Sequence, residues 1–208
     1  MKFLAGLFKK KSPVNSYLAE FLGAFGLALA VTMSVVLEFG LPTPLIAGVT
    51  LGLFVYTVGS ISGAHLNPAI TIAMLAHKKI EVKDAFFYIV LQLLGGFAAF
   101  GLVLLLNGEP AFVPVDGSFL TFVAEALGAA FLAFGVSAVV FGNVDDDMAG
   151  VVIGGSLFIG AMIASVQSNG VLNPAVALGL DSVSLAYVLG PIVGALVGSA
   201  LYRVLVRK

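Results

Sequence analysis

The tripeptide Asn-Pro-Ala occurs twice in this chain, each time inside an apolar region of membrane length. The copies are Asn67-Pro68-Ala69 and Asn173-Pro174-Ala175, so the two asparagines lie 106 positions apart. Proline fits the first turn of a helix, where its missing N–H is not needed, so each motif predicts a helix start. The apolar piece that follows is about ten residues long, half of what a helix needs to cross a bilayer. Paired broken helices of this kind are typical of the central sites of membrane channels and transporters.

The remainder of the chain is apolar enough to cross a membrane several times. It is 60% hydrophobic and only 10% charged, whereas soluble domains average about 25% charged residues. We therefore predict an all-α integral membrane protein in which two re-entrant half-helices accompany six transmembrane helices. The six helices are expected at roughly 16–38, 43–64, 84–106, 118–141, 148–168 and 184–206.

Two similar halves are visible in one transmembrane channel domain covering residues 1–208. They run over about 12–107 and 117–208, and Glu20 and Glu125 occupy similar Ala-Glu-x-x-Gly segments 105 positions apart. Each half has three spans, an odd number, so the second half enters the membrane upside down. Such an inverted repeat brings the half-helices together at the membrane centre, where irregular backbone must be buried or face a water-filled cavity. A central pore is the resulting hypothesis.

The basic residues predict the topology. Six spans place both termini and the loop after the second span on one side, which the positive-inside rule makes cytoplasmic. We expect a multi-pass protein of the plasma membrane, with the lipid bilayer and no nucleic acid among its partners. All ten Lys and Arg residues fall in three clusters: Lys2 with Lys9 to Lys11; Lys78, Lys79 and Lys83; and Arg203, Arg207 and Lys208.

The motif asparagines are candidate pore residues. Asn67 and Asn173 would offer side-chain N–H donors at the pore centre, where the helix N-termini carry partial positive charge. Such a centre binds water by its oxygen and opposes the passage of cations and protons. The simpler alternative is that each asparagine only caps its half-helix.

Three ionisable residues near the motifs are candidates for bracing the re-entrant loops. Glu20 and Glu125 lie inside spans, where a charge is expensive. We expect each to accept hydrogen bonds from backbone N–H groups of a loop, with a proton relay as the alternative. His65 is expected to brace the loop or to line the inner vestibule, with pH sensing as its alternative.

Other features suggest packing or turns. The small-residue spacing of Gly48 and Gly52 predicts close helix packing. Asp145 to Asp147 could hold a divalent cation and gate the channel, but three adjacent acids more often form a solvated turn. We therefore expect no metal site and no catalytic residues.

On these motifs the chain resembles the aquaporin family, the major intrinsic proteins. The resemblance covers nearly the whole chain. It implies a homotetramer with one pore per subunit and passive movement of water or small neutral solutes without a cofactor. The matching residues are Ala19-Glu20-Phe21-Leu22-Gly23, Ser62-Gly63-Ala64-His65-Leu66-Asn67-Pro68-Ala69, Gln92, Asn173-Pro174-Ala175 and Gly190-Pro191-Ile192-Val193-Gly194.

One departure from the family pattern concerns the selectivity filter. Typical members carry an arginine directly after the second Asn-Pro-Ala, where this chain has Val176. The family's spacing places the other filter positions at Ala47, Ala161 and Gly170, so all four are small or apolar. This filter predicts a wide channel for water and solutes such as glycerol, urea or ammonia. A non-conducting structural membrane protein is the main alternative, and a secondary transporter is a third hypothesis.

Overall fold

The computed structural model describes residues 13–38, 40–111, 113–114 and 117–207, all of whose regular elements are helices. Six helices are long and apolar enough to span a membrane, which confirms the predicted all-α fold class. The basic residues before position 13, Lys208, and the first residue of the predicted repeat lie outside the described residues. The long helices are α2 (Pro13–Val36), α3 (Thr43–Ser62), α5 (Val82–Asn107), α6 (Phe119–Val140), α7 (Ala149–Ala164) and α9 (Leu185–Val206).

The two half-helices differ in length. The first, α4, covers Pro68–Ala76, close to the ten residues predicted, but the second, α8, covers only Pro174–Gly179. The chain leaves α8 early because the Ser182 N–H turns back to the Ala177 carbonyl at 2.9 Å. The intervening Asp181 has a left-handed φ of 52°, which a continuing helix excludes.

Two spanning helices also differ from their predicted limits by more than two residues at one end. Helix α2 begins at Pro13, three residues earlier than expected, because proline is tolerated in a first helical turn. Helix α7 ends at Ala164 instead of residue 168, and beyond it the chain turns, with the Ser168 N–H donating back to the Ala164 carbonyl at 3.0 Å. A short 3₁₀ helix, η1 (Asp146–Met148), precedes α7.

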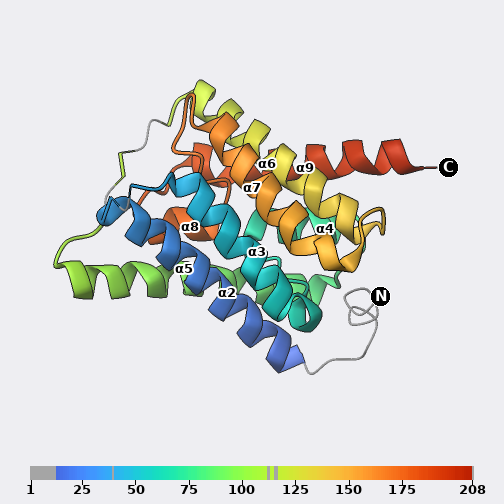
Figure 1. Cartoon of the computed structure of the whole chain (residues 1–208), viewed down its shortest axis with the longest axis horizontal. Coiled ribbons are helices and arrows are strands. Elements are labelled where there is room, and N and C mark those ends of the chain that lie inside the picture. The colour runs from blue at the N-terminus through green and yellow to red at the C-terminus, as the bar shows by residue number, and fades with distance from the viewer. Residues whose placement is uncertain (1–12, 39, 112, 115–116, 208) are drawn as a thin grey trace.

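The half-helices interlock the two halves of the molecule. Helix α4 packs most extensively against α9, whereas α8 packs against α5 and α2. Figure 1 shows α4 and α8 entering from opposite ends of the bundle. We call the end where α2 starts and α3, α6 and α9 finish the inner end, and the opposite one the outer end.

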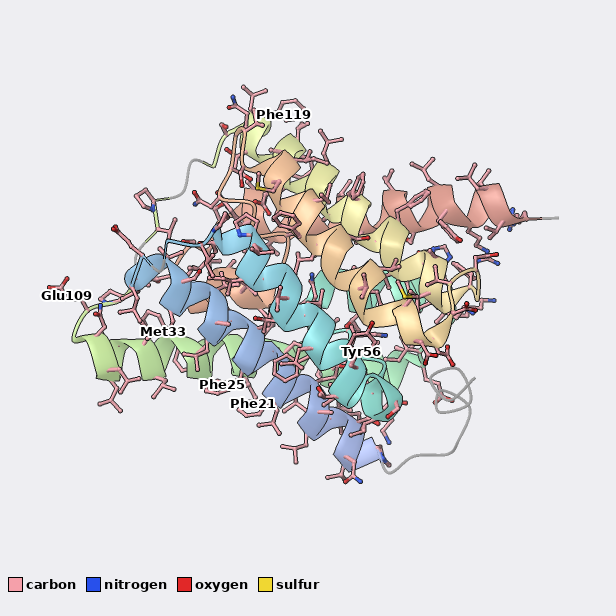
Figure 2. The ribbon with its side chains drawn as sticks, viewed as in Figure 1. Phe21, Phe25, Met33, Tyr56, Glu109 and Phe119 are labelled. Carbon is pink, nitrogen blue, oxygen red and sulfur yellow. The ribbon has the colours of Figure 1, made fainter. Side chains whose placement is uncertain are left out.

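Glycines allow the central helices to cross at very short range. A Cβ atom at Gly48 would lie 2.6 Å from the Gly154 carbonyl oxygen, and one at Gly52 would lie 2.7 Å from that of Gly150. The close packing predicted for Gly48 and Gly52 is therefore confirmed, and its partner is α7. Apolar side chains such as Phe119, 76% exposed, project from the outside of the bundle, as expected for a lipid-facing surface (Figure 2).

Candidate functional site: a cavity where the two half-helices meet

The two motif asparagines tie the half-helices together. Each caps its own helix, because the Asn67 Oδ1 accepts from the Ala69 N–H and the Asn173 Oδ1 from the Ala175 N–H, both at 2.9 Å. Each also reaches across to the other half: the Asn67 Nδ2 donates to the Leu172 carbonyl at 2.9 Å. An amide nitrogen carries two N–H donors, so each asparagine has a second one beyond this cross-link.

The leucine before each motif has an unusual backbone conformation. Asn173 returns the cross-link by donating to the Leu66 carbonyl at 3.0 Å. Leu66 and Leu172 have φ values of 49° and 55°, in the left-handed region that few residues other than glycine adopt, and both are fully buried. Such strain persists only where surrounding contacts enforce it, and it often marks functional sites. Here it turns both carbonyls toward the opposite asparagine.

The buried Glu20 holds the first loop in this shape. One carboxylate oxygen accepts from the Leu66 N–H at 2.7 Å, and the other accepts from the His65 N–H at 3.0 Å. Two side chains add to this, since the Ser62 hydroxyl donates at 2.6 Å and the Gln92 amide at 2.7 Å. The backbone donors that the loop cannot satisfy by itself are thus paired within the protein.

Glu125 holds the second loop in nearly the same way. Its oxygens accept from the Leu172 N–H at 2.6 Å and the Val171 N–H at 3.0 Å, and the Ser168 hydroxyl donates at 2.7 Å. Sequence analysis assigned no bracing role to Ser168 or to its counterpart Ser62. The signal was present, because each serine lies five residues before its motif asparagine.

His65 belongs to the first loop and lines the cavity between the half-helices. Its Nδ1 is 3.2 Å from the Thr71 hydroxyl oxygen, and its ring packs edge-on against Tyr88 with centroids 5.4 Å apart. The Gln92 amide also donates to Thr71, at 2.9 Å. The side chain therefore joins the same polar network that surrounds Glu20.

A cavity of about 350 Å³ runs through the meeting point of the half-helices. Its wall extends from Val35 and Thr43 at the outer end, past Asn67 and Asn173, to Val140 at the inner end. Among the described residues that line it there is no Asp, Glu, Lys or Arg. The cavity is therefore a mainly apolar passage with a few neutral polar groups.

Three of the four expected filter residues line this cavity: Ala47, Gly170 and Val176. Ala161 does not. Its carbonyl oxygen accepts from the Ser165 hydroxyl at 2.7 Å. A Cβ atom on Gly170 would lie only 2.5 Å from this same oxygen. At this level the α7 side of the wall is formed by neighbours of Ala161 such as Ser165.

Comparison with known proteins agrees with this architecture. Residues 7–202 match the family model described as "Major intrinsic protein". The chain belongs to the major intrinsic protein family. This major intrinsic protein is 36% identical to "Glycerol uptake facilitator protein-like 6" of Lactiplantibacillus plantarum, over 92% of the chain and 98% of that protein. It is 34% identical to Nodulin-26 of Glycine max, over 76% of the chain, and spans 62% of that protein's length.

The fold has a solved counterpart. The X-ray structure of the aquaglyceroporin from Plasmodium falciparum superposes with a TM-score of 0.62 at 22% identity, covering 92% of this chain and 94% of that one. Together with the family match, these findings confirm the resemblance recognised in the sequence. The protein is a multi-pass membrane channel for water and small solutes, in a family of channels.

The acidic segment of this major intrinsic protein lies at the inner surface. Asp146 and Asp147 begin the helix η1, and the Asp147 carbonyl accepts from the Tyr56 hydroxyl at 2.9 Å (Figure 2). No group of three or more potential metal ligands occurs among the described residues. The contacts of the segment are those of a surface turn.

Proposed function

We propose that this chain is a passive channel with a wide, apolar filter that conducts water and small neutral solutes such as glycerol, urea or ammonia. The uncharged cavity wall carries this proposal. An ion entering such a passage would lose its hydration without an opposite charge to replace it, which is prohibitively costly. A neutral solute loses far less, and the free N–H groups of Asn67 and Asn173 would compensate part of that loss.

The proposed filter consists of Ala47, Ala161, Gly170 and Val176. Ala161 would act through its backbone, because its carbonyl excludes any side chain larger than hydrogen at Gly170. Val176 is buried and lines the cavity, so no fixed positive charge stands at this level among the described residues. The passage would therefore select by size and by hydrogen bonding.

The motif and bracing residues would act behind the filter. Pro68, Ala69, Pro174 and Ala175 would start the half-helices so that both asparagines face the passage. Glu20, Glu125 and His65 would keep the loops in place through the hydrogen bonds described above. Transport of this kind forms and breaks no covalent bond, so it would require neither a cofactor nor a catalytic group.

The relatives support a solute wider than water. The names "glycerol uptake facilitator" and "aquaglyceroporin" occur among the proteins to which this chain is similar. We propose one channel domain of two inverted repeats, about 12–107 and 117–208, assembled as a homotetramer in the plasma membrane. Both termini would be cytoplasmic, because the end of α4 and the end of α9 lie toward the inner end (Figure 1). Lys78 and Lys79 follow α4, and Arg203 lies in the last turn of α9.

Stopped-flow light scattering on proteoliposomes tests this function. Vesicles are challenged in turn with an impermeant osmolyte, glycerol and urea, using the wild type and Val176→Arg. We expect fast shrinkage followed by fast re-swelling in the solutes, and re-swelling suppressed by the arginine. Val166→Arg is the matched control, because Val166 is 77% exposed and does not line the cavity.

Other outcomes would support other functions. Rates equal to those of empty vesicles would favour a non-conducting structural protein. Flux that saturates and depends on an ion gradient would favour a transporter. Equal suppression by both arginines would contradict the proposed filter position while leaving channel activity intact.

A further inference from the structure

The connection between α5 and α6 contributes to the cavity wall at its outer end. Val113 is the one described residue of this connection that lines the cavity, together with Val35, Val176 and Leu180. Ala111, two residues earlier, is buried but does not line it. Among the described residues of the connection, a single side chain thus lines the passage.

Hydrogen bonds to residues before and after the half-helix α8 fix the backbone around Val113. The Ser182 hydroxyl donates to the Val113 carbonyl at 2.8 Å, and the Val113 N–H donates to the Leu180 carbonyl at 3.4 Å. Before α8, the Asn169 amide donates to the Pro114 carbonyl at 3.1 Å. Since Val176 lies within α8, these bonds set Val113 at a defined position relative to the proposed filter.

We propose that Val113 is a specificity-determining residue, which completes an apolar outer collar with Val35, Val176 and Leu180. This inference rests on the proposed function. The four side chains of the collar offer no hydrogen bond, so a solute hydroxyl that faces them loses hydration there without replacement. Between neutral solutes of similar size, the one with fewer hydroxyl groups therefore passes faster.

Glycerol and propane-1,2-diol test this selectivity, because they differ by one hydroxyl group. Their permeabilities are measured in proteoliposomes and corrected for empty vesicles, and the diol-to-glycerol ratio is compared between variants. Val113→Thr keeps the side-chain shape and adds a hydroxyl. We expect the ratio to fall by about fivefold, the factor expected for one added hydrogen bond.

Two further variants separate a direct effect from a loosened loop. Val183→Thr is the matched control, since Val183 is 52% exposed and does not line the cavity, and it should leave the ratio unchanged. Ser182→Ala removes the bond to the Val113 carbonyl and should lower the ratio by displacing the collar. Val176→Thr is the positive reference for a polar group within the collar.

The outcomes distinguish this inference from the proposed function. A wild type that conducts neither solute would contradict the function itself. A conducting wild type whose ratio responds to Val176→Thr but to neither Val113→Thr nor Ser182→Ala would overturn the role of Val113. A fall in the ratio with Val113→Thr and none with Val183→Thr would establish it.

Discussion

The two re-entrant loops are the inner loop before α4 and the outer loop before α8. Each is held by a buried glutamate, Glu20 or Glu125, but the surroundings of the two loops differ. At the same offset of 106 positions, His65 of the inner loop corresponds to Val171 of the outer loop, and Thr71 corresponds to Ala177. The inner loop therefore lies in a polar network that includes Gln92, whereas Val171 and Ala177 offer no side-chain hydrogen bond at the corresponding positions of the outer half. One backbone design can thus carry a polar network beside one motif and apolar side chains at the corresponding positions beside the other.

The loops are also stabilised by different elements. The inner half-helix α4 has nine residues, and the outer half-helix α8 has six. The shorter helix gains support from the α5–α6 connection, through Ser182 and Asn169. The inner loop gains comparable support from within its own half, through Gln92 and through the Tyr88 hydroxyl, which donates to the Ser62 carbonyl at 2.7 Å.

The largest effect is expected from removing the braces. Glu20→Ala removes the shared acceptor of four donors, and Glu125→Ala removes that of three, of which the Ser168 hydroxyl keeps the Ala164 carbonyl at 3.0 Å. Each buried donor left without an acceptor costs about 1–3 kcal/mol. Both variants should lose thermal stability in detergent, Glu20→Ala the more strongly. Glu109→Ala, at an exposed position on the periphery, is the control (Figure 2). A greater loss for Glu125→Ala would show that the outer half depends more on its brace.

A smaller difference is expected from two corresponding glycines. The nearest atoms to a Cβ at Gly23 would all belong to the Leu66 side chain. A Cβ at Gly128 would lie 2.5 Å from the Leu172 side chain and 2.5 Å from the Gly160 carbonyl oxygen. Side chains can shift more readily than backbone, so Gly128→Ala should destabilise the protein more than Gly23→Ala, by about 1–3 kcal/mol. Gly155→Ala, which meets nothing within 4 Å, is the matched control for thermal unfolding. Equal melting temperatures for the two test variants would refute this asymmetry.

A substitution at His65 tests the polar network of the inner loop directly. His65→Val makes the inner loop resemble the outer one, and it removes a hydrogen-bonding group from the cavity. We expect osmotic water permeability per channel to fall by about fivefold, the equivalent of one hydrogen bond. His77→Val serves as the control, because His77 does not line the cavity. An unchanged permeability for His65→Val would mean that the His65 side chain does not limit water flow.

The repeated motifs allowed most of the fold to be predicted from sequence, because membrane length and helix-start chemistry are local properties. Spacing alone could not show that Ala161 turns its carbonyl, and not its side chain, toward Gly170. Nor could it predict the early end of α8, which depends on a turn at Asp181. Val113 was missed for a similar reason: its place in the wall follows from hydrogen bonds to residues about 70 positions away.

The smallest effect concerns the ends of the half-helices, where His77 caps α4 and Leu180 caps α8. Burial lowers the pKa of His77 below its ordinary value of 6.5, and the charges of Arg203 and Lys79 lower it further. The lowered pKa means that the unfolded chain binds a proton at His77 more readily than the folded chain does. The contribution of neutral His77 to the free energy of unfolding is therefore present above pH 6.5 and is lost as the pH falls below it. The melting temperature of the wild type should therefore drop slightly more than that of His77→Asn between about pH 7.5 and about pH 5.5. If the melting temperatures of the two proteins fall equally with pH, the His77 cap of α4 contributes no pH-dependent stability, like the Leu180 cap of α8.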